Sequence, residues 1–139
     1  MNFLLDTNVI TEPMKAQPNA GVLAWLAKVD EDSVFLSVVT ITALRYGVEP
    51  LATGRRRDRL DGWLRKDLHS RFEGRILSID LEIADACGRL VARSESAGRP
   101  LEPRDALIAA TAVVNGLTLV TRHASDFEAT VKAVVTPWT

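Results

Sequence analysis

The sequence predicts an α/β protein, a three-layer α/β/α sandwich with a mostly parallel central sheet. Short apolar segments rich in β-branched residues alternate with longer segments of helical periodicity, in the order β-α-α-β-α-α-β-α-α-β-α-β. The 139 residues suffice for one domain with a sizeable core, and no repeat or linker divides them, so a single domain spanning 1–139 is expected. Sheets of this kind carry their sites at the carboxyl ends of the strands.

Five segments have the composition of buried strands, because each is short and either apolar or rich in β-branched residues. These predicted strands cover residues 3–5, 34–39, 76–80, 117–120 and 131–135. Their spacing leaves room for one or two helices between successive strands, which favours parallel pairing.

The segments between the strands predict helices. Thr7 is expected to cap a short first helix, and Thr40 to cap the helix after the second strand. Residues 55–72 have apolar side chains at three- and four-residue spacing among Arg and Lys, which predicts an amphipathic basic helix. Residues 105–114 are almost wholly small and apolar, which predicts a central buried helix that the following Asn-Gly ends.

Charge is unevenly distributed along the chain. The net charge is −1, yet residues 55–75 hold eight Arg or Lys against four Asp or Glu. This local excess either binds a polyanion or is the solvated face of an amphipathic helix, and the sequence leaves both open. No apolar run approaches the roughly 18 residues that span a bilayer, and no signal-peptide pattern begins the chain, so a cytoplasmic protein is expected. Cys87 is the only cysteine, which excludes an internal disulfide and a cysteine-rich zinc site.

Three acids interrupt apolar elements. Asp6 ends the first strand, Asp105 opens the buried helix, and Asp126 follows the fourth strand. A buried carboxylate costs several kcal/mol unless it is paired, hydrogen-bonded or metal-bound, so all three are candidates for one site. Each also has a purely structural alternative: a helix cap for the first, a helix-dipole partner for the second and a turn residue for the third.

The donor chemistry of such a site favours hard divalent ions. Carboxylates without cysteine or a histidine pair suit Mg²⁺ or Mn²⁺, which support phosphoryl-transfer reactions. No Gly-rich phosphate loop or nucleophile elbow is present. A phosphoacceptor receiver domain is disfavoured, because the late strand leads into Thr121 and Arg122 where such a domain carries a lysine.

Five motifs stand out along the chain: Leu4 to Ile10, Ser37 to Thr40, Asp105 to Ala112, Leu119 to Arg122 with Asp126 and Phe127, and Pro137 with Trp138. Together they resemble those of the PIN-domain ribonuclease toxins of the VapC type, in the FitB-like branch. The resemblance covers essentially the whole chain and implies a PIN fold.

The resemblance also implies a function. Such a protein is the toxin of a type II toxin–antitoxin pair, a Mg²⁺- or Mn²⁺-dependent endoribonuclease that cleaves RNA, often tRNA or rRNA. It forms homodimers and is held inactive by a VapB-type antitoxin in a hetero-oligomer. The matching motifs assign the catalytic metal site to Asp6, Asp105 and Asp126, with support from Thr7, Asn8 and Thr121; Arg55, Arg56 and Arg57 are candidate RNA contacts.

Position 43 departs from the family pattern. The helix after the second strand normally carries a glutamate where this chain has Ala43, so a fourth carboxylate and the acid of a Thr-x-x-Glu capping box are missing. Impaired metal binding and turnover are therefore expected, and the otherwise intact motifs favour an inactivating substitution over natural divergence. His123, where the family commonly has Asn, is a smaller departure without an assigned consequence.

One alternative to catalysis stays open. A non-catalytic PIN module could use the same surface to bind RNA or an antitoxin. Tyr46 and Trp63 are candidates for dimer or antitoxin contacts.

Overall fold

The computed structural model describes residues 1–139 and contains a five-stranded sheet in the order β3-β2-β1-β4-β5. All four strand pairings are parallel, and the central strand β1 pairs with β2 and β4 on its two sides. The strands are β1 (Phe3–Leu5), β2 (Val34–Ser37), β3 (Ile76–Leu77), β4 (Thr118–Val120) and β5 (Val134–Val135). The predicted parallel sheet is confirmed.

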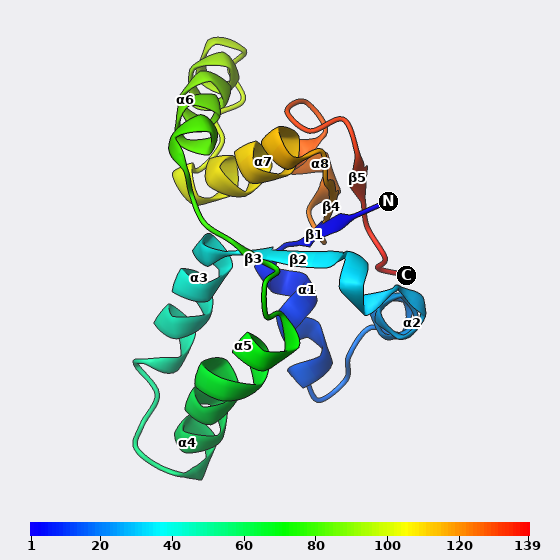
Figure 1. Ribbon diagram of the computed structural model, residues 1–139, viewed down its shortest axis with the longest axis vertical. Coiled ribbons are helices and arrows are strands. Elements are labelled where there is room, and N and C mark those ends of the chain that lie inside the picture. Colours follow the sequence, from blue (N-terminus) through cyan, green and yellow to red (C-terminus); the bar gives the residue numbers. More distant parts are fainter.

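Eight α-helices surround this sheet. They are α1 (Thr7–Thr11), α2 (Ala20–Lys28), α3 (Val38–Val48), α4 (Arg55–Gly62), α5 (Leu68–Arg71), α6 (Leu81–Ser96), α7 (Pro103–Asn115) and α8 (Ala124–Phe127). Figure 1 shows α6 and α7 on one side of the sheet, with α1, α3, α4 and α5 on the other. Short 3₁₀ turns, Glu12–Met14 and Glu31–Ser33, precede α2 and β2.

Two hydrophobic cores separate the layers. Successive strand residues point to opposite faces of a sheet, so Leu4 packs with residues of α6 and α7, whereas Leu5 packs with residues of α1, α3 and α5. In β4, Leu119 and Val120 divide between the same two cores. The sheet is therefore buried on both faces, as the predicted three-layer sandwich requires.

The helix that follows β2 begins earlier than predicted. Ser37 is its N-cap, and the Ser37 hydroxyl accepts a hydrogen bond from the Val39 N–H at 3.0 Å. The predicted cap at Thr40 is wrong, because Thr40 lies inside α3, fully buried. The capping box inferred for Ala43 is wrong for the same reason. A capping box needs its acid three residues after the N-cap, and three residues after Ser37 the chain has Thr40, not position 43.

Other helix and strand boundaries also differ from those predicted from the sequence. Asp6 caps α1 in place of Thr7. The basic helix predicted over 55–72 is a continuous helical arm, but a π-helical turn, Trp63–Asp67, joins α4 to α5. β3 and β5 are only two residues long, and Asp80, predicted as the end of a strand, caps α6.

The central buried helix is confirmed as α7. It begins at Pro103, ends at Asn115, and is followed by Gly116 in the left-handed conformation that glycine favours. None of the helices has both the length and the apolar character needed to cross a membrane.

Candidate active site

Asp6 lies where β1 ends, at the carboxyl edge of the sheet, and is 8% exposed. Its N–H donates to the Val120 carbonyl at 2.9 Å, which extends the β1–β4 pairing. One carboxylate oxygen, Oδ1, accepts from the Thr7 N–H at 2.8 Å. The other, Oδ2, accepts from the Thr121 hydroxyl at 2.9 Å and from the Asn8 amide at 3.4 Å. Backbone and side chain are thus both fixed by neighbours.

Asn8 and Thr121 also tie the end of β1 to the loop after β4. Thr121 is fully buried, and its hydroxyl accepts a hydrogen bond from the His123 N–H at 3.1 Å. The Asn8 side-chain oxygen accepts from the Arg122 N–H at 3.1 Å. The network that orients Asp6 therefore also positions the backbone of His123.

Asp105 is held differently. It lies in the first turn of α7, partly buried, and its side chain forms no hydrogen bond or ion pair. Burial raises the pKa of Asp105, and the negative charges of Asp6, Glu102 and Asp126 raise it further, while His123 opposes them. Asp105 is therefore within electrostatic reach of every other acid at this edge of the sheet.

A cavity of about 250 Å³ joins these elements. Its walls come from β1 and the start of α1, from α3, from the start of α7 and from the loop after β4. The lining residues are Asp6, Thr7, Asn8, Val39, Ala43, Glu102, Arg104, Asp105, Ile108 and His123. The structure thus brings Asp6 and Asp105 together with position 43, where only a methyl group faces the cavity.

Asp126 belongs to an adjacent hollow. It is exposed and lines a cavity of about 240 Å³ with Arg93 and Arg99, between the end of α6 and α8. The Asp126 N–H donates to the His123 carbonyl at 3.0 Å, so its backbone is joined to the rim of the first cavity. No three Asp, Glu, His or Cys side chains lie close enough together to make a complete metal site.

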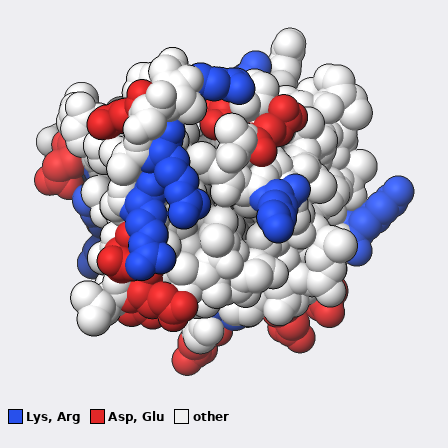
Figure 2. All heavy atoms as spheres, turned by 90° about the horizontal axis from the view of Figure 1, so that it is seen from above, with Lys and Arg blue, Asp and Glu red and all other residues white.

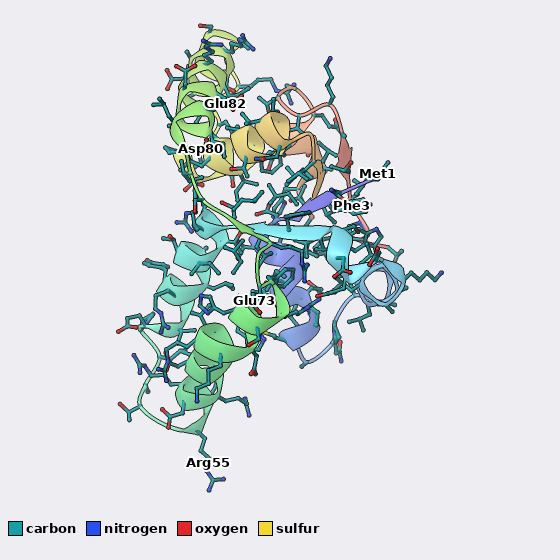
Figure 3. All side chains as sticks on the ribbon, in the orientation of Figure 1. Met1, Phe3, Arg55, Glu73, Asp80 and Glu82 are labelled. Atoms are coloured by element: carbon teal, nitrogen blue, oxygen red, sulfur yellow. The ribbon has the colours of Figure 1, made fainter.

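The predicted RNA contacts lie elsewhere. Figure 3 shows Arg55 at the far end of the α4 arm, pointing into solvent away from the sheet. Arg57 lies 3.4 Å from Glu49 in an ion pair, and Arg56 lines a separate groove with Met14 and Trp63. None of the three arginines lines the cavity that holds Asp6 and Asp105.

Ion pairs join the basic arm to its own acids and to neighbouring segments. Asp61 binds Arg45 at 2.7 Å and Arg65 at 2.9 Å, and Arg71 binds Glu31 at 2.6 Å. On the α6–α7 end of the molecule, Figure 2 shows a short band of Lys and Arg bordered by acidic side chains. Positive charge on this face is therefore confined to a short band and forms no broad basic surface.

The sequence motifs did not predict Glu102 or Arg104 as residues of the cavity, and they assigned no role to His123. Glu102 and Arg104 flank Pro103 directly before Asp105, and neither side chain has a hydrogen-bond or ion-pair partner. His123, which departs from the family pattern, also lines the cavity. The position of Glu102 and Arg104 could have indicated them, because a short charged segment at the start of a buried helix lies at the carboxyl edge of the sheet, where sites form.

Comparison with known proteins identifies the family of the chain. A family model described as the PIN domain matches residues 3–132. The chain is 42% identical over 136 residues to the plasmid stability protein StbB of Pseudomonas syringae pv. tomato, 38% identical over 136 residues to toxin FitB of Neisseria gonorrhoeae, and 36% identical over 136 residues to the VapC ribonuclease Y4jK of Sinorhizobium fredii. Each alignment covers 98% of this chain and 97% or 98% of the relative.

Solved structures give the same result. The structure of FitAB bound to the IR36 DNA fragment superimposes with a TM-score of 0.93 at 36% identity, covering 99% of this chain and 96% of that one. A toxin–antitoxin complex from Klebsiella pneumoniae matches with a TM-score of 0.75 at 26% identity, covering 99% and 98%.

The chain therefore belongs to the PIN-domain family. Within that family it groups with the VapC/FitB-type toxins of toxin–antitoxin systems, close to FitB and StbB. The resemblance read from the sequence motifs is confirmed.

Proposed function

We propose that this protein is the toxin of a type II toxin–antitoxin pair and a divalent-metal-dependent endoribonuclease. The observation that carries the proposal is the cavity that holds Asp6 and Asp105, at the carboxyl edge of a parallel sheet. A relative at 36% identity is a VapC ribonuclease, which supports RNA as the substrate.

The residues of the cavity fit Mg²⁺ or Mn²⁺. Its potential ligands are carboxylate oxygens and a single imidazole, without any thiol, and hard divalent ions prefer such oxygen-rich sets. Asp6 and Asp105 would hold the ion, with Asp126 approaching from the adjacent hollow. When bound, the ion supplies an activated water and neutralises charge on the phosphate.

The chain's own groups have separable tasks. Thr7, Asn8 and Thr121 fix the Asp6 carboxylate, so that it need not reorganise during the reaction. Arg104 lines the cavity without an ion-pair partner and is suited to contact a backbone phosphate. Val39, Ala43 and Ile108 give the cavity its apolar wall.

The RNA path leads past Arg104 to Arg93 and Arg99, which line the hollow beside Asp126. These positions are closer to the acidic groups than the α4 arm is, since Arg55 points into solvent at the opposite end (Figure 3). The α4 arm then acts as a solvated or partner-binding face, and tRNA or rRNA is the expected substrate class.

Ala43 limits the activity of this copy. The α3 wall of the cavity presents a methyl group where the family pattern has a carboxylate. Loss of one such group commonly reduces metal affinity or activity by roughly 10–100-fold. Impaired rather than abolished cleavage is the expected state.

The partner is a VapB-type antitoxin. Support comes from the toxin–antitoxin complex of Klebsiella pneumoniae, whose chain matches along nearly the full length of this one. A homodimer of the toxin within a hetero-oligomer is the assembly implied by the sequence motifs.

A second candidate function is a non-catalytic PIN module that binds RNA or an antitoxin. It is favoured by Ala43 and by the lack of three converging metal ligands. It differs from the first candidate in predicting that no change at position 43 produces cleavage.

Cleavage of tRNA and rRNA with Mn²⁺, with and without EDTA, separates the two. The variants are Ala43→Glu, the matched uncharged control Ala43→Gln, and Asp6→Asn. We expect Ala43→Glu to cleave at least about tenfold faster than the parent chain and Ala43→Gln, and Asp6→Asn to be inactive. If the parent chain and Ala43→Glu both fold but cut no RNA, the nuclease function is wrong and the binding module stands.

A further inference from the structure

Residues 137–139 lie beside the start of α2 (Figure 1) and are hydrogen-bonded to it. The Asn19 side-chain amide donates to the Thr139 carbonyl at 3.0 Å, and its Oδ1 accepts from the Thr139 N–H at 3.2 Å. The same Oδ1 accepts from the Gly21 N–H at 3.0 Å and so caps α2. Both ends of the Asn19 amide are therefore engaged, which fixes the segment to the helix.

The helix and the segment approach most closely at Gly21. A Cβ atom at this position would clash with the Pro137 carbonyl oxygen and would lie 2.6 Å from the Thr139 Cγ2. The N–H of Asn19 also donates to the buried Glu12 carboxylate at 2.9 Å. The residue that holds the segment is thus itself anchored in the protein.

Trp138 joins this segment to the loop after β4. It is partly buried and packs against the hydrophobic core that contains Leu5, Val9 and Val120. The guanidinium carbon of Arg122 lies 6.0 Å from the centroid of its ring, which is a cation–π arrangement. Arg122 is exposed and has no salt bridge, so the ring is the contact that orients its side chain.

The backbone of Arg122 belongs to the network that orients Asp6. Its N–H donates to the Asn8 Oδ1 at 3.1 Å, and the Asn8 amide nitrogen donates to the Asp6 Oδ2 at 3.4 Å. The adjoining Thr121 hydroxyl donates to the same Oδ2 at 2.9 Å. A continuous set of contacts therefore leads from Trp138 through Arg122 and Asn8 to the Asp6 carboxylate.

We propose that Trp138 is a positioning residue for the Asp6 site. Its ring holds the Arg122 guanidinium, and this contact keeps the loop of residues 121–123 against Asn8 and Asp6. The effect on metal binding rests on the proposed function, whereas the effect on the loop does not. Residues 137–139 thereby contribute to the site without lining its cavity.

Amide hydrogen exchange, followed by NMR on the full chain, tests the loop directly. The reporters are the N–H groups of Arg122 and His123, which are hydrogen-bonded within the network, and the Leu119 N–H in β4 is the reference. Trp138→Leu keeps an apolar side chain but removes the aromatic face, whereas Trp138→Phe keeps a ring. We expect Trp138→Leu to speed exchange of the reporters about two- to fivefold relative to Leu119, which matches the free energy of an exposed cation–π contact. Trp138→Phe should change it less; equal effects of the two variants contradict the proposal.

Removing the cation gives a second arm of the test. Arg122→Gln should speed exchange of the His123 N–H as Trp138→Leu does, and the double variant should add nothing, because both changes break one contact. Trp25→Leu is the matched control, at a tryptophan that packs on the same core but pairs with Phe3. Additive effects, or a Trp25→Leu variant that loosens the loop equally, would show that Trp138 acts only through packing.

Mn²⁺ binding, measured by calorimetry, shows whether the loop affects the site. Trp138→Leu should raise the dissociation constant by up to about two- to fivefold, because no more than the free energy of the lost contact can be transmitted, and Trp138→Phe should raise it less. A loosened loop with an unchanged dissociation constant contradicts the positioning of the site. If the parent chain binds no Mn²⁺, the proposed function fails, and the exchange measurements alone decide whether Trp138 positions the loop.

Discussion

The two acidic walls of the cavity are built in contrasting ways. On the β1 side, Asp6 is nearly buried and both of its carboxylate oxygens accept hydrogen bonds from Thr7, Asn8 and Thr121. On the α7 side, Asp105 and Glu102 have no hydrogen-bond or ion-pair partners and face like charges. The carboxylate of the β1 wall has hydrogen-bond partners within the protein, whereas those of the α7 wall have none.

The two walls therefore hold their carboxylates in different electrostatic environments. The hydrogen bonds of Asp6 compensate for its burial, so the fold can keep it in place permanently. The repulsion around Asp105, which His123 partly opposes, is further relieved by protonation or by a cation. We therefore expect a bound cation to stabilise the α7 wall more than the β1 wall.

The largest effect on stability is expected at Asp6. Asp6→Ala removes the cap of α1 and leaves the buried Thr121 hydroxyl without its acceptor, so the free energy of unfolding should fall by about 1–3 kcal/mol. Urea denaturation measures this. Asp126→Ala, at an exposed acid, is the control and should change stability little; equal losses would show that the β1 wall is not structural.

Thr121→Val tests the network around Asp6 with a smaller change. It removes the hydroxyl that donates to Asp6 and accepts from His123, at a loss of about 1–2 kcal/mol in the free energy of unfolding. Thr118→Val is the matched control in the adjoining strand β4, because the Thr118 hydroxyl makes no hydrogen bond within the protein. Identical urea-unfolding midpoints for Thr121→Val and Thr118→Val would contradict a special role for Thr121.

Asp105→Asn should act in the opposite direction. Because burial and neighbouring acids raise the pKa of Asp105 above that of the unfolded chain, the folded state binds the proton more tightly, and stability falls as pH rises through this window. The variant should therefore unfold at a higher temperature than the parent at neutral pH without metal, and the gain should vanish below pH 3.8. Thermal unfolding between pH 3 and 8 checks this; a variant less stable than the parent at pH 7 contradicts it.

The smallest effect is expected on nucleic-acid affinity. Arg104→Ala should weaken RNA binding and reduce the salt slope by about one phosphate contact, whereas Arg55→Ala should leave both nearly unchanged. Binding titrations at several salt concentrations measure the slope. A larger effect of Arg55→Ala would move the RNA path to the α4 arm.

Much of the fold follows from local patterns in the sequence. Asp6 and Asp105 could be expected to meet, because the first strand ends in one and the buried helix begins with the other, at the same edge of a parallel sheet. The cap of α3 was less predictable. Ser37 and Thr40 are both good caps, and the choice depends on where β2 stops pairing with β3, at Ser37 and Leu77.

The remaining cavity residues depend on tertiary packing. Glu102 and His123 are exposed, on loops that approach each other only once α7 and β4 have packed onto the sheet. Local propensity carries no information about such an approach. The missing acid at Ala43, by contrast, was visible from the motif alone, and its position on the cavity wall gives that absence a physical meaning.

The central claim is that the two walls enclose a divalent-metal site, and a crystal soaked in Mn²⁺ tests it most directly. Data collected near the manganese absorption edge should give an anomalous difference peak in the cavity between Asp6 and Asp105, absent from crystals of Asp6→Asn. A well-ordered cavity without any such peak, or with a peak that survives in Asp6→Asn, would contradict the account.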